Sequence, residues 1–216
     1  MSRRLGSHLF WGSHTPLAAL TGAGLIIMAS SRFSFALLCA AALLWVYGLT
    51  ALVSSTAHTL MPARGRKIIL LFLSAFLCGL FMLFVGFINP LLVLGTSFFL
   101  FLIPPACLGS GFFEASESSP AGELIPRALL EASVLSGIIL AIALIREPLG
   151  MGTLSFPGGI QGVVELFDAY REDSFIPMRF LSASAGGLVL LGYGTALYRY
   201  LREQSGNTPQ NTEGEQ

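Results

Sequence analysis

Charged residues are scarce in this chain. Of 216 residues, 11% are charged, whereas 54% are hydrophobic, and the mean hydropathy is +0.74. A soluble globular domain has about 25% charged residues, so these few cannot cover a water-exposed surface of this size. The formal net charge of +0 gives no indication of a nucleic-acid partner. We therefore expect an integral membrane protein, and the soluble class is excluded.

Cysteine is also rare. Cys39, Cys78 and Cys107 lie in apolar stretches and have no short mutual spacing, which excludes a disulfide framework and a CxxC metal knuckle. We expect Cys39 and Cys78 to be packing residues. For Cys107 the same interpretation, an inert buried thiol, stands beside a functional one that is developed below.

A long uncharged run is the most informative feature that is present. No charged residue occurs between Lys67 and Glu114, and Pro104-Pro105-Ala106-Cys107 lies near the end of this run. A membrane span needs roughly 20 apolar residues, so the run is long enough to cross a bilayer about twice. The proline pair predicts a broken second crossing.

The apolar segments predict an all-α integral membrane protein with six transmembrane helices. We expect one membrane domain built from residues 1–67 and 68–200, followed by a disordered cytoplasmic tail at 201–216. A Gly-rich loop from Gly150 to Asp173 precedes the last span, and no phosphate-binding loop is expected there. The expected spans are 9–29, 33–55, 68–87, 91–111, 128–145 and 180–198.

The halves resemble each other in one respect. The first span is interrupted from Gly12 to Pro16 and the fourth from Pro104 to Cys107, which predicts two inverted three-helix repeats with broken first and fourth helices. Two ordinary kinked helices are the alternative. An even number of spans places both termini on one side, and the basic residues favour the cytoplasm. That side would hold Arg3, Arg4, Arg64, Arg66, Lys67, Arg127, Arg199 and Arg202, against Arg32, Arg146, Arg171 and Arg179.

Two motifs resemble a known family. The run Arg146-Glu147-Pro148-Leu149-Gly150-Met151-Gly152-Thr153-Leu154 is similar to the R-E-x-x-G-x-G-T-L signature of the D/E-type membrane subunits of Rnf and Nqr electron-transport complexes. Cys107, Gly111 and Glu114 have the spacing of that family's T-N-C-x-x-x-G-x-x-E pattern.

The resemblance implies a subunit of a redox-driven ion translocase in the bacterial inner membrane. It implies pairing with a homologous six-span subunit, alongside other subunits of the complex, and a 2Fe-2S cluster that both subunits hold through cysteines. Such a chain would help to pass electrons across the bilayer, coupled to Na+ or H+ movement, and would not be catalytic alone.

The chain departs from the family at the first half-helix. Where the family reads G-L-C-P, this sequence reads Gly12-Ser13-His14-Thr15-Pro16, with no cysteine. His14 is a weaker candidate ligand, because histidine replaces cysteine in Rieske-type clusters, but an interfacial histidine is the alternative. The missing cysteine leaves the ligand set of a family-type cluster incomplete in this chain.

Three charged residues in or directly after the fifth expected span are the remaining candidates for functional or structural roles. Glu131 is a candidate for an ion path because burying an acid at membrane depth is costly, although it could instead extend to the interface. Arg146 and Glu147 are expected to cap the helix end and to anchor the turn from Gly150 to Gly152.

Two functional hypotheses follow. The chain is a translocase subunit, or it is a non-redox membrane component, either a degenerate paralogue acting as an assembly scaffold or a small inverted-repeat carrier. Loss of iron on changing Cys107 would separate them.

Overall fold

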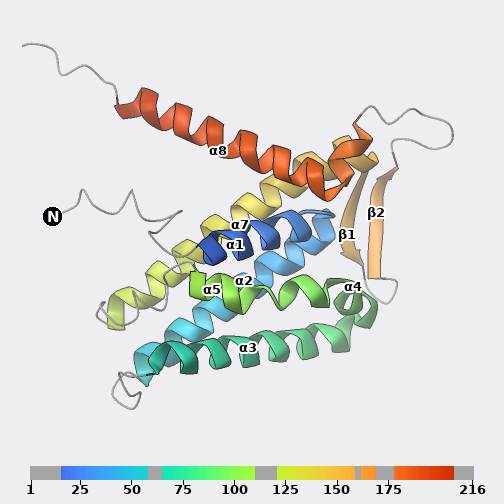
Figure 1. Ribbon diagram of the computed structural model, residues 1–216. Coiled ribbons are helices and arrows are strands. Elements are labelled where there is room, and N and C mark those ends of the chain that lie inside the picture. Colours follow the sequence, from blue (N-terminus) through green and yellow to red (C-terminus); the bar gives the residue numbers. More distant parts are fainter. Residues whose placement is uncertain (1–15, 58–64, 110–120, 159–161, 169–177, 207–216) are drawn as a thin grey trace, which may run out of the picture.

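The protein is mostly helical. The computed structural model describes residues 16–57, 65–109, 121–158, 162–168 and 178–206 (Figure 1). In chain order its elements are α1 (Pro16–Ala29), α2 (Phe33–Thr56), α3 (Arg66–Ile88), α4 (Pro90–Leu100), α5 (Ile103–Gly109), α7 (Ala121–Met151), β1 (Thr153–Gly158), β2 (Gly162–Asp168), the 3-10 turn η1 (Arg179–Ser182) and α8 (Ser184–Gly206).

Membrane-spanning length is reached by four helical segments in the described part of the chain. They are Phe33–Thr56, Arg66–Ile88, Pro90–Leu108 and Glu123–Met151, and they correspond to the second to fifth expected spans. The described part of the first span is α1, with 14 residues. The apolar part of α8, Ser184–Leu197, is also short, because the 3-10 turn occupies the start of the expected sixth helix.

The fifth helix is longer than expected. It was expected at 128–145, but α7 has 31 residues and contains Pro126 and Pro148. Each proline removes a backbone donor without ending the helix, so α7 extends beyond the expected span at both ends. The helix ends at Met151. The next residue, Gly152, has φ of 69°, and its N–H donates to the carbonyl of Pro148 at 3.0 Å, which makes it a left-handed C-terminal cap.

The helix α2 lies at the centre and packs most extensively on α7. In the most apolar 18-residue stretch of each helix, 56% of α2 is buried inside the protein, against 28% of α3 and 28% of α7. The face of α7 toward the core repeats small or apolar residues at helical spacing: Ala128, Ala132, Ser136, Ile139 and Ala143. Small residues let membrane helices approach closely, and Ser136 Oγ donates to the carbonyl of Ala40 on α2 at 3.3 Å.

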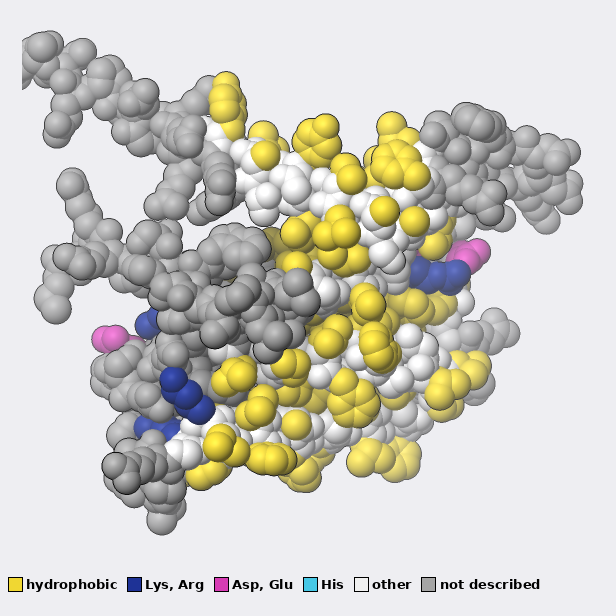
Figure 2. Space-filling model, in the orientation of Figure 1, with side chains coloured by type: hydrophobic (Ala, Val, Ile, Leu, Met, Phe, Trp, Pro, Cys, Tyr) yellow, Lys and Arg dark blue, Asp and Glu magenta, His cyan; other side chains and the backbone are white. Residues whose placement is uncertain are grey.

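The outer faces of α3 and α4 are strongly apolar. Phe72, Phe76 and Phe87 on α3 and Leu94 and Phe98 on α4 are all more than half exposed. In Figure 2 charged side chains gather toward two opposite ends of the visible face, and hydrophobic side chains fill the area between them. A monomer in water rarely exposes so large an apolar area. The surface therefore fits a protein embedded in a membrane.

Within the described residues, the otherwise helical protein has one pair of antiparallel strands, in the Gly-rich loop expected between Gly150 and Asp173. Strands β1 and β2 pair from Thr153 with Asp168 to Gly158 with Gly162. Asn89, in the expected turn before Pro90, accepts from Leu92 N at 3.1 Å and so caps α4. Its Nδ2 donates to the carbonyls of Gly158 and Gly162 at 3.0 and 3.1 Å, which ties the hairpin to the α3–α4 turn.

Candidate functional site

Cys107 lies on the short helix α5, which packs against α1. The fourth expected span is interrupted at Phe101 and Leu102, between α4 and α5, and not from Pro104 to Cys107 as expected, because those residues are helical within α5. Helix α5 packs against α1 and α3, and the three run close together in Figure 1. Cys107 is fully buried, at 0% exposure. It therefore faces the protein interior and not lipid.

The surroundings of the Cys107 thiol come from other helices. The side chain of Tyr47 on α2, itself 1% exposed, hydrogen-bonds with Cys107, and Cys78 and Glu131 lie close enough for electrostatic interaction with it. Cys78 on α3 donates to the carbonyl of Leu100, at the break before α5, at 3.2 Å. Cys39 on α2 interacts in turn with Cys78.

The described residues do not fit a complete iron–sulfur cluster site. Within residues 16–57, 65–109 and the later described ranges, no group of three or more His, Cys, Asp or Glu side chains is placed to hold a metal ion. Such a cluster needs four ligands in all, and Cys107 alone matches the family pattern here. Any further ligands must come from outside these ranges or from another chain.

Glu131 lies on α7 and is mostly buried. Its side chain is 11% exposed, and Oε1 lies 3.3 Å from Arg127 Nε, one turn earlier on α7. The other oxygen, Oε2, is buried and has no hydrogen-bond partner among the described residues. One oxygen of the carboxyl group therefore pairs with the half-exposed Arg127, and the other is buried in the protein.

Arg146 is almost fully buried, at 2% exposure, and each of its five N–H groups has an acceptor. The acceptors are oxygens of α1, η1 and adjacent residues: Leu181 O on Nε at 2.7 Å, Ile27 O and Ser30 Oγ on Nη1 at 2.7 and 3.2 Å, and Ser182 O and Ala183 O on Nη2 at 2.9 Å each. The guanidinium thus satisfies carbonyls at the negative end of α1 and holds that end against η1.

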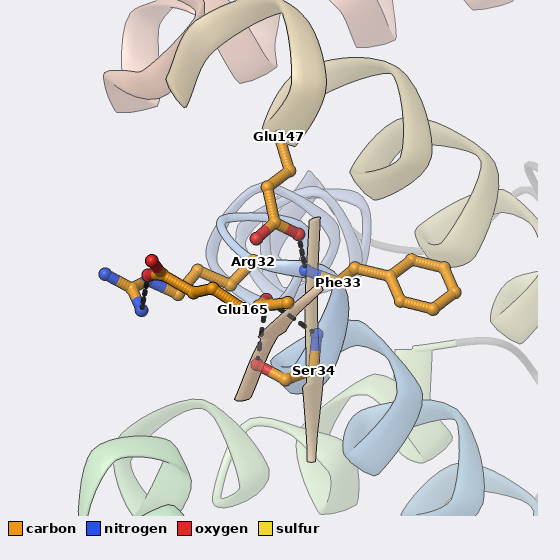
Figure 3. Close-up of polar contacts among 6 residues, drawn as sticks. Arg32, Phe33, Ser34, Glu147 and Glu165 are labelled. Carbon is orange, nitrogen blue, oxygen red and sulfur yellow. Dashed lines mark hydrogen bonds and ion pairs between the residues drawn. The ribbon is translucent and has the colours of Figure 1, made fainter. Parts of the chain in front are cut away.

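Glu147 caps the N-terminus of α2. Its Oε2 accepts from the N–H of Phe33, the first residue of α2, at 2.5 Å, while Arg32 at the N-cap position provides no side-chain cap. Figure 3 shows the carboxyl group of Glu147 descending from α7 onto this helix end. Adjacent residues of α7 therefore complement the opposite dipole ends of α1 and α2, so the capping role is present but serves α1 and α2, not the end of α7.

The hairpin completes this junction. Ser155 on β1 accepts from Ser34 N at 3.3 Å and donates to Ser34 Oγ at 3.2 Å, one residue along from the Glu147 contact. Glu165 on β2 lies 3.8 Å from Arg32 Nη1, with both side chains partly exposed. Figure 3 shows these residues together at the start of α2.

Glycine at position 150, in the motif from Arg146 to Leu154, allows α7 to approach η1 closely. A Cβ on Gly150 would lie 2.8 Å from Ser182 N, so only glycine fits against η1 there. Gly152 caps α7, and Thr153 begins β1. The remaining predicted site residues, His14, Gly111 and Glu114, lie outside the described residues.

Sequence reasoning missed Tyr47, Cys78, Ser34 and Ser155. No local signal could have found them, because each lies on a different element from the motif residue it serves. Comparison of the chain with models of known protein families finds no match, and no curated protein matches it either.

Proposed function

We propose that this chain is a membrane subunit of an ion-translocating electron-transport complex of the Rnf/Nqr type, helping to pass electrons across the bilayer coupled to Na+ or H+ movement. The observation that carries this proposal is the contact between α1 and α5, with the thiol of Cys107 buried there. Broken helices are tolerated at membrane depth where they line a site, and this is where a paired-subunit site is expected.

Glu131 supports the ion-moving part of the proposal. An acid within a membrane helix marks an ion or proton path by default, and one oxygen of Glu131 is buried without a partner among the described residues.

The proposal includes a homologous partner and an inverted repeat. The described part of this chain does not hold a full set of ligands, so the chain would work only with a second subunit of opposite orientation in the bacterial inner membrane. Both termini would then lie in the cytoplasm.

Iron in the native complex tests the proposal. The complex is purified from membranes through a tag on this chain, and iron per complex is measured for wild type, Cys107→Ala and Cys39→Ala. Cys39 is equally buried, at 0% exposure, and serves as the matched control. The proposal expects iron that is lost with Cys107→Ala and kept with Cys39→Ala.

A non-redox scaffold is the second candidate. It is favoured by one observation, the closed surroundings of the Cys107 thiol, which already has Tyr47 as its partner. Under this function the chain still co-purifies with partner subunits, and Cys107→Ala leaves iron and assembly unchanged.

A further inference from the structure

Glu147 follows Arg146 in the sequence, but Arg146 donates no hydrogen bond to it. Its neighbour Arg146 has five N–H donors, and all five are directed to oxygens of α1, η1 and adjacent residues. None is directed to Glu147. The guanidinium is therefore fully committed to structure and does not hydrogen-bond the adjacent carboxylate.

Capping of α2 gives a partner to only one of the two carboxyl oxygens of Glu147. Oε2 accepts from Phe33 N, whereas Oε1 is buried without a hydrogen-bond partner in the described structure. The residue is 1% exposed. A buried carboxylate is costly unless it is paired or bound to an ion, and a serine at the start of α2 would have capped the helix without this cost.

The groups facing Glu147 are few. They are Arg146 on the same helix, Arg32 at the start of α2 and Glu165 on β2, and the last two pair with each other. Helix α1 and strand β1 carry no charged or titratable residue, and the side chain of Arg179 in η1 lies outside the described part. Ser34 Oγ on α2 and Ser155 Oγ on β1 are hydrogen-bonded to each other, and neither is bonded to Glu147. Among the described side chains, no cationic group donates a hydrogen bond to Glu147 Oε1.

We propose that Glu147 Oε1 is a binding site for an exchangeable small cation, a proton or Na+, at the junction of α1, α2 and the hairpin. Carboxylate oxygens are among the ligands that hard cations prefer. The biological role of this site rests on the proposed function: in an ion translocase, Glu147 would be a second ion-binding residue besides Glu131.

Cation-dependent melting tests this site. The full-length chain, in its complex, is reconstituted in lipid nanodiscs, and its apparent Tm is measured with Na+ replaced stepwise by choline at constant ionic strength, and then across a pH series without Na+. A bound cation stabilises the folded state by mass action. We expect a rise of roughly 5 °C on saturation in wild type and a flat response in Glu147→Gln, which keeps an acceptor for Phe33 N.

The variants and conditions separate the outcomes. A response to Na+ identifies a Na+ site, and a response only to falling pH identifies a proton site. Glu165→Gln, which changes the nearby exposed acid, should respond as wild type does. A wild type that responds to neither, or a Glu147→Gln variant that responds as wild type does, overturns the proposal.

Carbodiimide labelling decides the matter if Glu147→Gln does not fold. Dicyclohexylcarbodiimide adds to protonated carboxyl groups in apolar surroundings, and peptide mass spectrometry of the wild-type complex locates the adduct. An adduct at Glu147 that is suppressed by Na+ or by alkaline pH supports the site, and no adduct at Glu147 overturns it. Neither experiment depends on iron, so a failure here is distinguishable from a failure of the proposed function.

Discussion

At the scale of single residues, Arg146 and Glu147 make several of the polar contacts that join distant parts of the described chain. Their acceptors and donors belong to α1, α2 and η1. Arginine suits this position because its planar fork presents donors in fixed directions. The adjacent glutamate suits a helix N-terminus, where backbone N–H groups lack partners.

Replacing Arg146 with lysine should destabilise the protein. Lysine has three donors, so at least two of the five buried acceptors of Arg146 lose their partner. The free energy of unfolding should fall by about 2–4 kcal/mol, because each unsatisfied buried polar group costs about 1–3 kcal/mol. Thermal melting in nanodiscs measures this.

The control is Arg127→Lys on the same helix, where the side chain is 50% exposed. It should change stability by less than about 1 kcal/mol. Equal effects at both positions would contradict the role given to Arg146.

At the scale of elements, the junction of α7, η1 and the hairpin depends on close backbone approach. Gly150→Ala would bring a Cβ to 2.8 Å from Ser182 N, whereas a Cβ on Gly137 in the same helix meets nothing within 4 Å. Gly150→Ala should therefore cost about 1–3 kcal/mol through overpacking, and Gly137→Ala should be neutral or stabilise by up to about 1 kcal/mol. Paired melting curves test this, and a neutral Gly150→Ala would show that α7 and η1 do not touch as described.

The hairpin should depend on Asn89. Asn89→Asp keeps an oxygen to cap α4 but removes the Nδ2 donor to Gly158 and Gly162. Amide hydrogen exchange should become faster in β1 and β2 and stay unchanged in α4, because only the tie to the hairpin is lost. Asn89→Ala should accelerate exchange in both regions. Unchanged exchange in the hairpin of either variant would mean that Asn89 does not hold it.

Long apolar elements were predictable from the sequence, and elements defined by distant contacts were not. Helices α2 and α3 match their expected spans within a few residues, because uninterrupted apolar runs of that length have few alternatives in lipid. The hairpin was missed because its strands are short, with six and seven residues, and because its anchor, Asn89, lies far away in the sequence, between α3 and α4. Cys107 was found by its position after two prolines, but its neighbours Tyr47 and Cys78 leave no local pattern.

At the scale of the whole molecule, the outer surface requires lipid. Phe76, near the middle of α3, is 65% exposed. Phe76→Lys should hinder membrane insertion, since lysine at a helix centre costs about 3 kcal/mol on insertion scales. Val164→Lys on β2, where Val164 is 45% exposed and lies outside the membrane-length helices, should insert normally. Carbonate extraction of membranes measures both, and equal extraction of the two variants would contradict a lipid-facing α3.

Redox-driven ion uptake tests the central claim most directly. Inverted membrane vesicles that contain the native complex are given an electron donor, and Na+ and H+ uptake are recorded with wild type, Cys107→Ala and Cys39→Ala. A redox-linked translocase subunit predicts uptake that is lost with Cys107→Ala and retained with Cys39→Ala. Uptake and electron flow that persist when the whole chain is deleted would contradict it.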